Sequence, residues 1–476
     1  MSIKSLGQTT ERRRVRRCQP AGIPALLLAA VLFAAVPPGA GATDNWPQFR
    51  GPDTRGVAEG PPLPPDQWSA GPPPQNIAWQ ADIPGRGWSS PVVWGNRIFL
   101  TTAVAEGETE EPKKGLYFGG ERPDPPDLVH RWMVLCLDLE SGGRLWERTV
   151  HEGKPPMPRH IKNSYASETP ATDGERVYAY FGNLGLWCLD LDGNVVWTKE
   201  MEPRRTRFNW GTAASPVLHE DRLYIVNDNE DESFLLALDK KTGEAVWRVP
   251  RAEKSNWSTP YVWVNEQRTE IVTPGTKQVR SYGLDGELLW TLEGMSKITI
   301  ATPYAVDGLL YVSSGYVGDK NRPLYAIRPG AEGDISLSPG PDGETPTSNA
   351  SIVWSKPQAA PYNPSTLVYQ GRLYVLYDRG RVACFDAKDG AVLYERQRIP
   401  GGRQFTSSPW AYGGKVFCLD ENGVTFVLKA GGEFEVLHEN RLADGDMGMA
   451  SPAIAGDRLI LRTSERVYCI RKGNGG

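Results

Sequence analysis

Ser215-Pro216-Val217 opens the stretch that decides the fold, which continues through Arg222-Leu223-Tyr224-Ile225, Ala237-Leu238-Asp239 and Thr242-Gly243 to Trp247. Similar stretches recur about every 45 residues, and a repeat of that period is typical of propellers and solenoids. Within each unit, apolar and polar residues alternate with a period of two, which predicts short, half-buried strands. The pattern therefore predicts an all-β repeat protein.

A proline opens each unit and allows the units to be counted. Eight such prolines occur: Pro91, Pro170, Pro216, Pro260, Pro303, Pro364, Pro409 and Pro452. Two of the spacings are longer than the others because they carry insertions. Gly95-Asn96 and Gly456-Asp457 have the composition of tight turns between antiparallel strands. We therefore predict eight blades of four antiparallel strands each.

An aromatic residue marks the outer strand of most units. The expected residues of this column are Trp146, Trp197, Trp247, Trp290, Trp354, Tyr394 and Val436. The eighth unit stops after its third strand, but Asn76-Ile77-Ala78-Trp79 supplies a spare outer strand at the other end of the chain. Pairing of these two segments would close a ring and leave no open sheet edge. The sequence thus predicts a closed propeller, which deletion of residues 76–79 should open.

These residues resemble the pyrroloquinoline-quinone-like propeller repeat, whose signature is Ala-x-Asp-x-x-Thr-Gly-x-x-x-Trp. The resemblance begins at residue 76 and runs to about residue 471. It implies an eight-bladed β-propeller. The superfamily includes quinoprotein alcohol dehydrogenases and the outer-membrane protein assembly factor of the Bam complex, so the resemblance implies a fold more strongly than a function. Asn45-Trp46-Pro47-Gln48-Phe49-Arg50-Gly51 is similar to the start of many exported bacterial members.

The first 42 residues have the composition of a signal peptide. An arginine-rich start precedes the apolar run Ala25–Val36 and the small-residue site Ala40-Gly41-Ala42. An uncleaved anchor and a twin-arginine export signal are the alternatives. We predict a signal peptide over 1–42, an N-terminal extension over 43–75 and the propeller over 76–476. The protein is then exported, either periplasmic or extracellular, in a bacterium.

Charge argues against two classes of partner. The full chain carries a formal net charge of −4, and removal of residues 1–42 takes away more basic than acidic residues. An acidic chain gives no reason to expect nucleic acid or an anionic membrane as partner. After signal cleavage no stretch is apolar enough to span a bilayer. We expect a protein, peptide or glycan partner in the cell envelope, bound by a monomer or by one component of a complex.

Cysteine falls mainly in one column of the repeat. The third-strand position holds Cys136, Cys188, Ala237, Gly283, Ala326, Cys384, Val427 and Cys469. Cysteine alternates there with small residues, which predicts buried free thiols that act as small apolar side chains. Cys418 lies on a second strand. Equivalent positions in neighbouring blades should lie too far apart for disulfides.

A quinone cofactor is the enzymatic alternative that the resemblance raises. Quinoprotein dehydrogenases typically use adjacent cysteines, a stacking tryptophan and Glu, Asn and Asp ligands to Ca²⁺, and this sequence has no Cys-Cys pair. It also has no Cys-x-x-Cys-His haem motif. Asp138, Asp190, Asp239 and Asp386 lie at blade turns, where they should hold the hairpins by local hydrogen bonds. We expect no cofactor and no metal, with pyrroloquinoline quinone and calcium as the alternative.

The unequal loops gather on one predicted face. This face bears the insertions 103–131, 151–167, 203–214 and 315–323, whereas the other is mostly tight turns apart from a mobile loop over 329–351. The loops that enter the inner strands carry the candidate ligand or partner residues: Trp88, Asn209, Trp210, Asn256, Trp257, Tyr362, Arg403 and Phe405. Their aromatic rings could stack a planar or sugar-like ligand. The alternative is that they plug the channel and pack between blades.

Two further clusters are weighed as metal sites. Residues 227–232 read Asn-Asp-Asn-Glu-Asp-Glu and could bind a hard cation, although the favoured interpretation is a solvated hairpin tip. His130, His151, His160 and His219 lack metal-ligand spacing and are interpreted as solvated loop residues.

These features favour an exported, non-catalytic propeller that binds or scaffolds a partner, with a possible role in cell-envelope or outer-membrane protein assembly. A divergent quinone-dependent oxidoreductase and a glycan-binding or polysaccharide-acting module are the alternatives.

Overall fold

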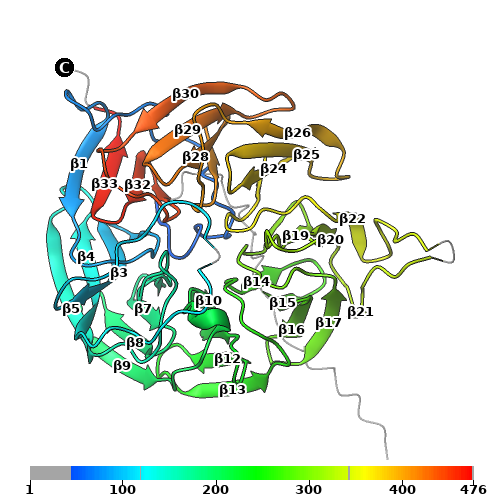
Figure 1. Ribbon diagram of the computed structural model, residues 1–476, viewed down its shortest axis with the longest axis horizontal. Coiled ribbons are helices and arrows are strands. Elements are labelled where there is room, and N and C mark those ends of the chain that lie inside the picture. Colours follow the sequence, from blue (N-terminus) through cyan, green and yellow to red (C-terminus); the bar gives the residue numbers. More distant parts are fainter. Residues whose placement is uncertain (1–43, 118, 341–342, 474–476) are drawn as a thin grey trace, which may run out of the picture. The chain divides into compact units, whose positions relative to one another are not determined.

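Eight β-sheets surround a central axis in the computed structural model, which describes residues 44–117, 119–340 and 343–473 (Figure 1). The chain builds the sheets in sequence order, so the eight-bladed propeller is confirmed. The predicted signal peptide lies outside the described residues. Within the described ranges the helical segment is the short turn η1 (Arg207–Asn209), and no helix is long and apolar enough to cross a membrane.

The first four blades are formed by these strands: β2 (Val92–Trp94), β3 (Arg97–Ala105), β4 (His130–Asp138), β5 (Arg144–Gly153); β6 (Ala171–Thr172), β7 (Arg176–Phe181), β8 (Gly185–Asp190), β9 (Val195–Glu200); β10 (Val217–His219), β11 (Arg222–Asn227), β12 (Phe234–Asp239), β13 (Ala245–Pro250); β14 (Tyr261–Val264), β15 (Thr269–Pro274), β16 (Gln278–Gly283), β17 (Leu288–Glu293).

The last four blades are formed by these strands: β18 (Tyr304–Val306), β19 (Leu309–Ser313), β20 (Leu324–Ile327), β22 (Ile352–Lys356); β23 (Leu367–Tyr369), β24 (Arg372–Tyr377), β25 (Arg381–Asp386), β26 (Val392–Arg398); β27 (Trp410–Tyr412), β28 (Lys415–Leu419), β29 (Val424–Lys429), β30 (Val436–Arg441); β31 (Ala453–Ala455), β32 (Arg458–Arg462), β33 (Arg466–Arg471), β1 (Ile77–Asp82).

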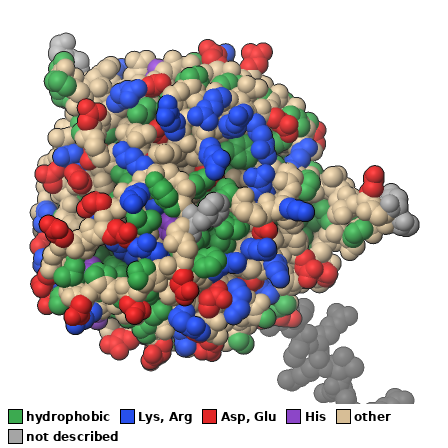
Figure 2. All heavy atoms as spheres, in the orientation of Figure 1, with side chains coloured by type: hydrophobic (Ala, Val, Ile, Leu, Met, Phe, Trp, Pro, Cys, Tyr) green, Lys and Arg blue, Asp and Glu red, His purple; other side chains and the backbone are tan. Residues whose placement is uncertain are grey.

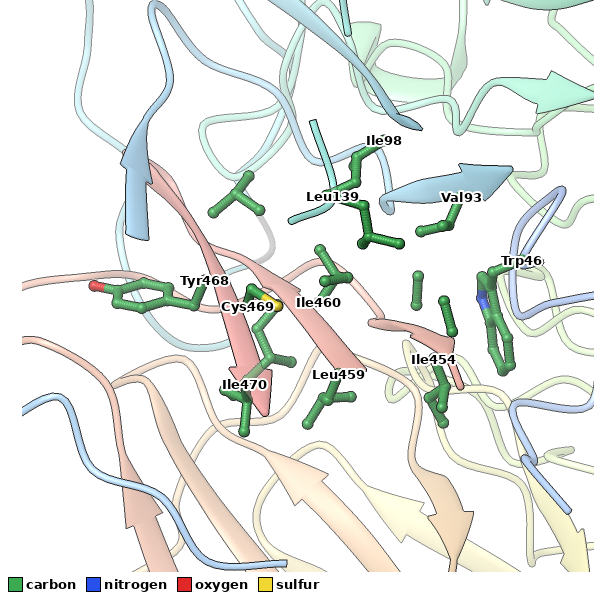
Figure 3. Packing of buried hydrophobic residues seen from close by; sticks show 14 of the residues in the cluster. Trp46, Val93, Ile98, Leu139, Ile454, Leu459, Ile460, Tyr468, Cys469 and Ile470 are labelled. Atoms are coloured by element: carbon green, nitrogen blue, oxygen red, sulfur yellow. The ribbon is translucent and has the colours of Figure 1, made fainter. Parts of the chain in front are cut away.

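The N-terminal strand closes the ring as the sequence predicts. β1 pairs antiparallel with β33, with Trp79 opposite Cys469. Figure 3 shows the packing beside this closure, where Val93 and Leu139 of blade one face Ile454 and Ile460 of the last blade. The ends of the propeller chain therefore share one sheet and one apolar core.

Five outer-strand tryptophans of the described chain each join their blade to the next. Their indole N–H groups donate to backbone carbonyls of the following blade at 2.8–3.1 Å, and the described pairs are Trp79 to Leu139, Trp146 to Leu191, Trp197 to Lys240, Trp247 to Leu284 and Trp354 to Ala387. A glycine of the accepting hairpin lies under the ring. At Gly243, which has φ +74°, an added Cβ would come within 2.5 Å of Trp197. The Trp of one blade and the Asp-x-x-x-Gly hairpin of the next therefore form the two sides of one contact between blades.

The aspartates of the same hairpins have the predicted structural role. Asp239 Oδ1 accepts hydrogen bonds from the backbone N–H groups of Lys241 and Thr242 at 2.8 and 3.0 Å. Asp138 makes the same bonds to Glu140 and Ser141. At Asp239 the largest single effect is desolvation, which by itself would raise the pKa of the carboxyl group. Hydrogen bonds to the ionised form together outweigh it, so the pKa of both Asp138 and Asp239 is lowered.

Two positions of the repeat columns differ from the prediction. Ser281, not Gly283, lies opposite Trp290 in blade four, and His438, not Val436, lies opposite Val427 in blade seven. The indole of Trp290 donates to Glu270 of its own blade at 2.6 Å instead of reaching the next blade. A strand places residues two positions apart on the same face of the sheet. The sequence alone therefore does not distinguish Gly283 from Ser281, or Val436 from His438, as the residue of the column.

The expected mobile loop over 329–351 contains ordered structure. Its segment β21 (Gly333–Asp334) pairs in parallel with β17, which adds a fifth strand to blade four. Ala331 and Ile335 are buried beside it. The loop thus covers the outer edge of the blade whose tryptophan does not reach its neighbour, and Pro/Gly-rich composition hid this contact.

All five cysteines of the described chain are buried and free: Cys136, Cys188, Cys384, Cys418 and Cys469. Burial raises the pKa of the four third-strand thiols to about 12. Since the thiolate is the reactive form, these side chains are packing residues, as the column predicts.

Candidate functional site

An axial cavity of about 230 Å³ lies where the inner strands converge. A belt of eight hydroxyls surrounds it, one from the start of each blade: Ser90, Thr169, Ser215, Thr259, Thr302, Ser365, Ser408 and Ser451. Among the described residues, six hydrogen bonds of 2.9–3.1 Å run around the belt, each from a backbone N–H of one blade to the hydroxyl of the next. The belt thus joins the blades at the axis as the tryptophans join them at the rim.

The belt corrects the count by prolines at one blade. In blade six Ser365 occupies the hydroxyl position and Thr366 occupies the place that proline takes elsewhere, so Pro364 is one residue before the belt. The serine or threonine of the belt makes the contact with the neighbouring blade. The proline that follows it in the other blades is replaced by Thr366 in blade six.

The N-terminal extension forms the floor of the cavity. Trp46 pairs with Val93 in an antiparallel bridge on blade one, and Phe49 reaches the cavity wall. Arg50 is buried, donates to the carbonyl of Thr366 at 2.8 Å and lies 5.2 Å over the ring of Tyr304. Burial lowers the pKa of its guanidinium to about 10. The motif at residues 45–51 therefore closes one end of the channel.

A loop that we name the strap, residues 106–129 between β3 and β4, crosses the other end of the channel. Its Gly115 N–H donates to Glu421 of blade seven at 2.6 Å, and its Gly120 carbonyl accepts the indole N–H of Trp210 at 2.9 Å. Leu116 and Tyr117 line the cavity from above. The insertion in blade one thus spans the mouth from blade three to blade seven (Figure 1).

Four of the eight predicted site residues line the axial cavity: Trp88, Trp210, Trp257 and Tyr362. The three tryptophans are only 7–8% exposed. Their indoles donate to backbone carbonyls of Lys162, Gly120 and Gly211, respectively. These rings therefore both face the cavity and fix the loops around it.

The other four predicted residues lie outside the cavity lining. Asn209 is part of η1, and Asn256 is buried and donates to Asp228. Phe405 is buried in the core of blades six and seven, where it packs against Phe426. Arg403 is exposed. The eight predicted residues therefore do not all lie around one cavity.

Sequence reasoning missed a buried ion pair at the cavity wall. Lys162 Nζ lies 2.5 Å from Glu421 Oε1, and Thr406 donates to the same oxygen at 2.7 Å. Both charged side chains are almost fully buried. They come from blades two and seven, so no local spacing could have paired them. The pair holds the strap, because Glu421 also accepts the Gly115 N–H.

The histidines are placed differently from the expectation of solvated loop residues. His130 is buried on β4, and His151 packs its ring against Trp132. His160 lines the cavity with its ring 5.0 Å from that of Trp210, and its Nδ1 accepts the Lys162 N–H at 3.2 Å. Burial, with the positive charge of Lys162, lowers the pKa of His160 to about 4.

Replacement of His160 by asparagine should flatten the pH dependence of stability between pH 6.5 and 4. The pKa of His160 is about 4 in the folded protein against 6.5 in the reference state, so its contribution is complete above pH 6.5 and is lost as the pH falls towards 4. The intact protein should lose up to about 3 kcal/mol over this range through His160. Urea unfolding of both proteins at several pH values measures the difference, and parallel curves would contradict the burial of a neutral imidazole.

The acidic segment 227–232 is exposed at Asp231 and Glu232, as expected of a solvated tip, but its first half is buried and paired. The side chains of Asp228 and Arg251 are 0% exposed and form two parallel hydrogen bonds of 2.8 and 2.9 Å. Asn229 Oδ1 accepts the backbone N–H groups of Asp231 and Glu232. Asp231 itself pairs with Arg205. The sequence suggested solvation because the basic partners lie in other loops.

The cavity walls do not fit a calcium-bound quinone. Within the described residues the lining contains no Asp or Glu, and no group of three or more His, Cys, Asp or Glu could hold a metal ion. The Glu421 carboxylate, which pairs with Lys162 of the lining, already accepts hydrogen bonds from Lys162, Thr406 and the Gly115 N–H. Neither the calcium ligands nor adjacent cysteines of a quinoprotein site are supplied.

Fold and repeat define a propeller of the quinoprotein-like class. The family model described as outer membrane protein assembly factor BamB matches residues 74–231, 186–315 and 347–476, and the chain belongs to this family.

Solved structures share the fold at low sequence identity. BamB from Moraxella catarrhalis has a TM-score of 0.50 at 12% identity, covering 78% of this chain and 98% of that one. Quinohemoprotein alcohol dehydrogenase from Comamonas testosteroni has a TM-score of 0.57 at 12% identity, covering 92% of this chain and 82% of that one.

A curated relative is similar over a shorter stretch. The quinone-dependent 1-butanol dehydrogenase of Thauera butanivorans is 28% identical over 167 residues, which covers 30% of this chain. The aligned part spans 26% of that dehydrogenase. The relatives therefore include both an assembly factor and dehydrogenases.

Proposed function

We propose that this protein is an exported, non-catalytic binding or scaffold protein of the bacterial cell envelope. In this proposal the face that bears the strap and η1 holds a protein partner. Membership of a family described as an outer membrane protein assembly factor supports the class of function. The cavity lining, which lacks the carboxylates of a quinone site, supports a non-catalytic role.

The observation that carries the proposal is the backbone of Phe208. This residue has φ +53° and ψ 20°, and it is 39% exposed. The left-handed conformation costs an L-amino acid about 1–2 kcal/mol, and it is a true outlier for a bulky side chain. Arg207 lies 5.2 Å over the ring, and the Arg122 N–H of the strap donates to the Phe208 carbonyl at 3.0 Å. An exposed aromatic held at this cost is typical of a binding contact.

Tyr117 of the strap provides a second exposed ring on this face. It is 45% exposed, although the strap around it is fixed at Gly115 and Gly120. Tyrosine and phenylalanine on rigid supports are frequent anchors in protein interfaces.

Replacement of Phe208 by asparagine should separate stability from binding. Asparagine tolerates the left-handed conformation, so the free energy of unfolding should stay the same or rise by up to about 1 kcal/mol. Chemical denaturation measures this change. A loss of stability above 1 kcal/mol would show that the ring is a packing residue instead.

The partner experiment uses crosslinked capture from envelope extract, with captured proteins quantified. The double variant Tyr117→Ala/Phe208→Asn should recover at least about tenfold less of the proteins that the intact chain recovers. Val264→Ala is the matched control, since Val264 is 65% exposed on β14 and lies in a groove lined by first-to-second strand turns. Equal recovery by all three proteins would overturn the proposed face.

The enzymatic alternative has its own test. Purified protein supplied with pyrroloquinoline quinone and Ca²⁺ should show no dye-linked alcohol oxidation, because the lining offers no carboxylate to hold the ion. Alcohol-dependent dye reduction that requires both additions would overturn the non-catalytic proposal.

A further inference from the structure

A second cleft, of about 290 Å³, lies between blades five and six. Arg322, Arg379, Arg381 and Arg396 line it, and Arg398 ends the adjacent strand; we name these five the cleft arginines. The cleft also includes apolar and aromatic residues: Leu116, Val317, Pro361, Tyr362 and Tyr377. Leu116 and Tyr362 line the axial cavity as well, so the cleft adjoins the strap.

The cleft arginines have no acidic partner among the described residues. They donate hydrogen bonds to uncharged groups: Arg381 to the Arg396 carbonyl, Arg396 to the Gln358 carbonyl, Arg398 to the Arg379 carbonyl and Arg322 to the Gln358 side chain. Nε of Arg322 is buried without a partner. Single arginines elsewhere, such as Arg148 and Arg328, also donate to carbonyls, whereas Arg144, Arg205 and Arg441 each pair with a carboxylate. The cleft is distinguished by the number of arginines gathered in it.

One carboxylate, Asp378, lines the cleft together with the arginines, and Glu395 lies on the adjacent strand β26. The Asp378 carboxylate accepts the backbone N–H groups of Tyr362 and Asn363 and the side-chain amide of Asn363, at 2.6–2.9 Å. Glu395 is exposed on β26 and forms no ion pair with another described residue. Four arginines therefore line the cleft with one carboxylate, and among the described residues none of the four forms an ion pair with it.

This arrangement costs stability. Arg381 lies directly opposite Arg398 in the β25–β26 ladder, and like charges in that position repel. Arg396 adopts φ +46° in the same strand. Figure 2 shows Lys and Arg side chains gathered over these blades on a protein whose formal net charge is −4. Repulsion without an internal partner points to a negatively charged ligand.

We propose that the arginine cleft binds an acidic, extended segment of a partner polypeptide, in which carboxylate side chains alternate with apolar ones. The inference rests on the proposed function and names the chemistry of its partner. Guanidinium groups match carboxylates in bidentate geometry. The apolar and aromatic part of the cleft distinguishes a peptide from an anionic polysaccharide, because only the peptide brings apolar side chains to cover it.

Fluorescence anisotropy with labelled peptides tests the cleft directly. The intact protein should bind the hexapeptide (Glu-Val)₃ at least about tenfold more tightly than (Gln-Val)₃ and more tightly than hexaglutamate. Affinity for (Glu-Val)₃ should fall with added salt. Equal binding of the Glu and Gln peptides would overturn the proposal, and so would tight binding of heparin without binding of (Glu-Val)₃.

The test variant is Arg381→Gln/Arg398→Gln. It should bind (Glu-Val)₃ at least about tenfold more weakly and should unfold at the same or a higher temperature, because it removes a repulsive pair. Arg144→Gln/Arg441→Gln is the matched control with the same change of charge, and it should bind as the intact chain does. Equal loss in both variants would overturn the cleft. Failure here with continued partner capture through Tyr117 and Phe208 would leave the proposed function standing.

Discussion

A protein that lacks residues 76–79 is expected to lose about 5 kcal/mol of unfolding free energy and to aggregate more readily than the intact chain. The deletion removes the Trp79 ring, whose loss alone should cost about 3 kcal/mol. It also removes the Trp79 bond to Leu139 and the bond from the Arg471 N–H to the Asn76 carbonyl, each worth about 1 kcal/mol. The exposed edge of β33 becomes available to other chains.

Trp146→Ala is the matched control for this deletion. It removes the same kind of ring from the interface between blades one and two but leaves β1 paired with β33. Thermal unfolding should therefore shift further in the deletion protein than in Trp146→Ala, and light scattering on heating should rise only in the deletion protein. An unchanged midpoint after the deletion would contradict closure of the ring by β1.

Asp228→Ala is expected to destabilise the protein by about 3–5 kcal/mol, because it leaves Arg251 buried without its counter-ion. Thr273 and Tyr282 would still accept from the guanidinium, but neither supplies negative charge. Urea unfolding measures the loss.

Asp231→Ala in the same hairpin is the control for Asp228→Ala. Asp231 pairs with Arg205, which is two-thirds exposed, so its replacement should cost no more than about 1 kcal/mol. Similar losses in the two variants would contradict the different burial of these pairs. The joint replacement Asp228→Leu/Arg251→Met should recover part of the stability, because it removes both charges together.

The repeated contacts were predictable because the same chemistry recurs at one spacing. Trp79 could be assigned to the last blade by counting strands, and Asp239 could be assigned to its hairpin from local sequence alone. The errors at Pro364 and Gly283 arose where a unit uses a different residue for the same contact. Ser365 supplies the belt hydroxyl of blade six without a proline after it. The indole N–H of Trp290 donates to Glu270 of its own blade instead of to a carbonyl of the next blade.

The candidate site could not be predicted to the same extent, since it is made of contacts that occur once. Lys162 and Glu421 meet across the axis although 259 positions separate them. The cleft arginines approach one another through the pairing of β25 with β26 and a loop of blade five, which composition does not reveal. Trp88, Trp210 and Trp257 were found because they precede inner strands, but their hydrogen bonds depend on the strap and on neighbouring blades.

The pairing of β1 with β33 has a consequence for the order of events during synthesis. The segment that leaves the ribosome early contains Val57, Ser69 and Trp79, while their partners Ala411, Arg441 and Cys469 are made last. The floor of the channel and the final blade can therefore form only when the whole chain is available. Closure joins the most distant parts of the sequence, which makes it a slow step.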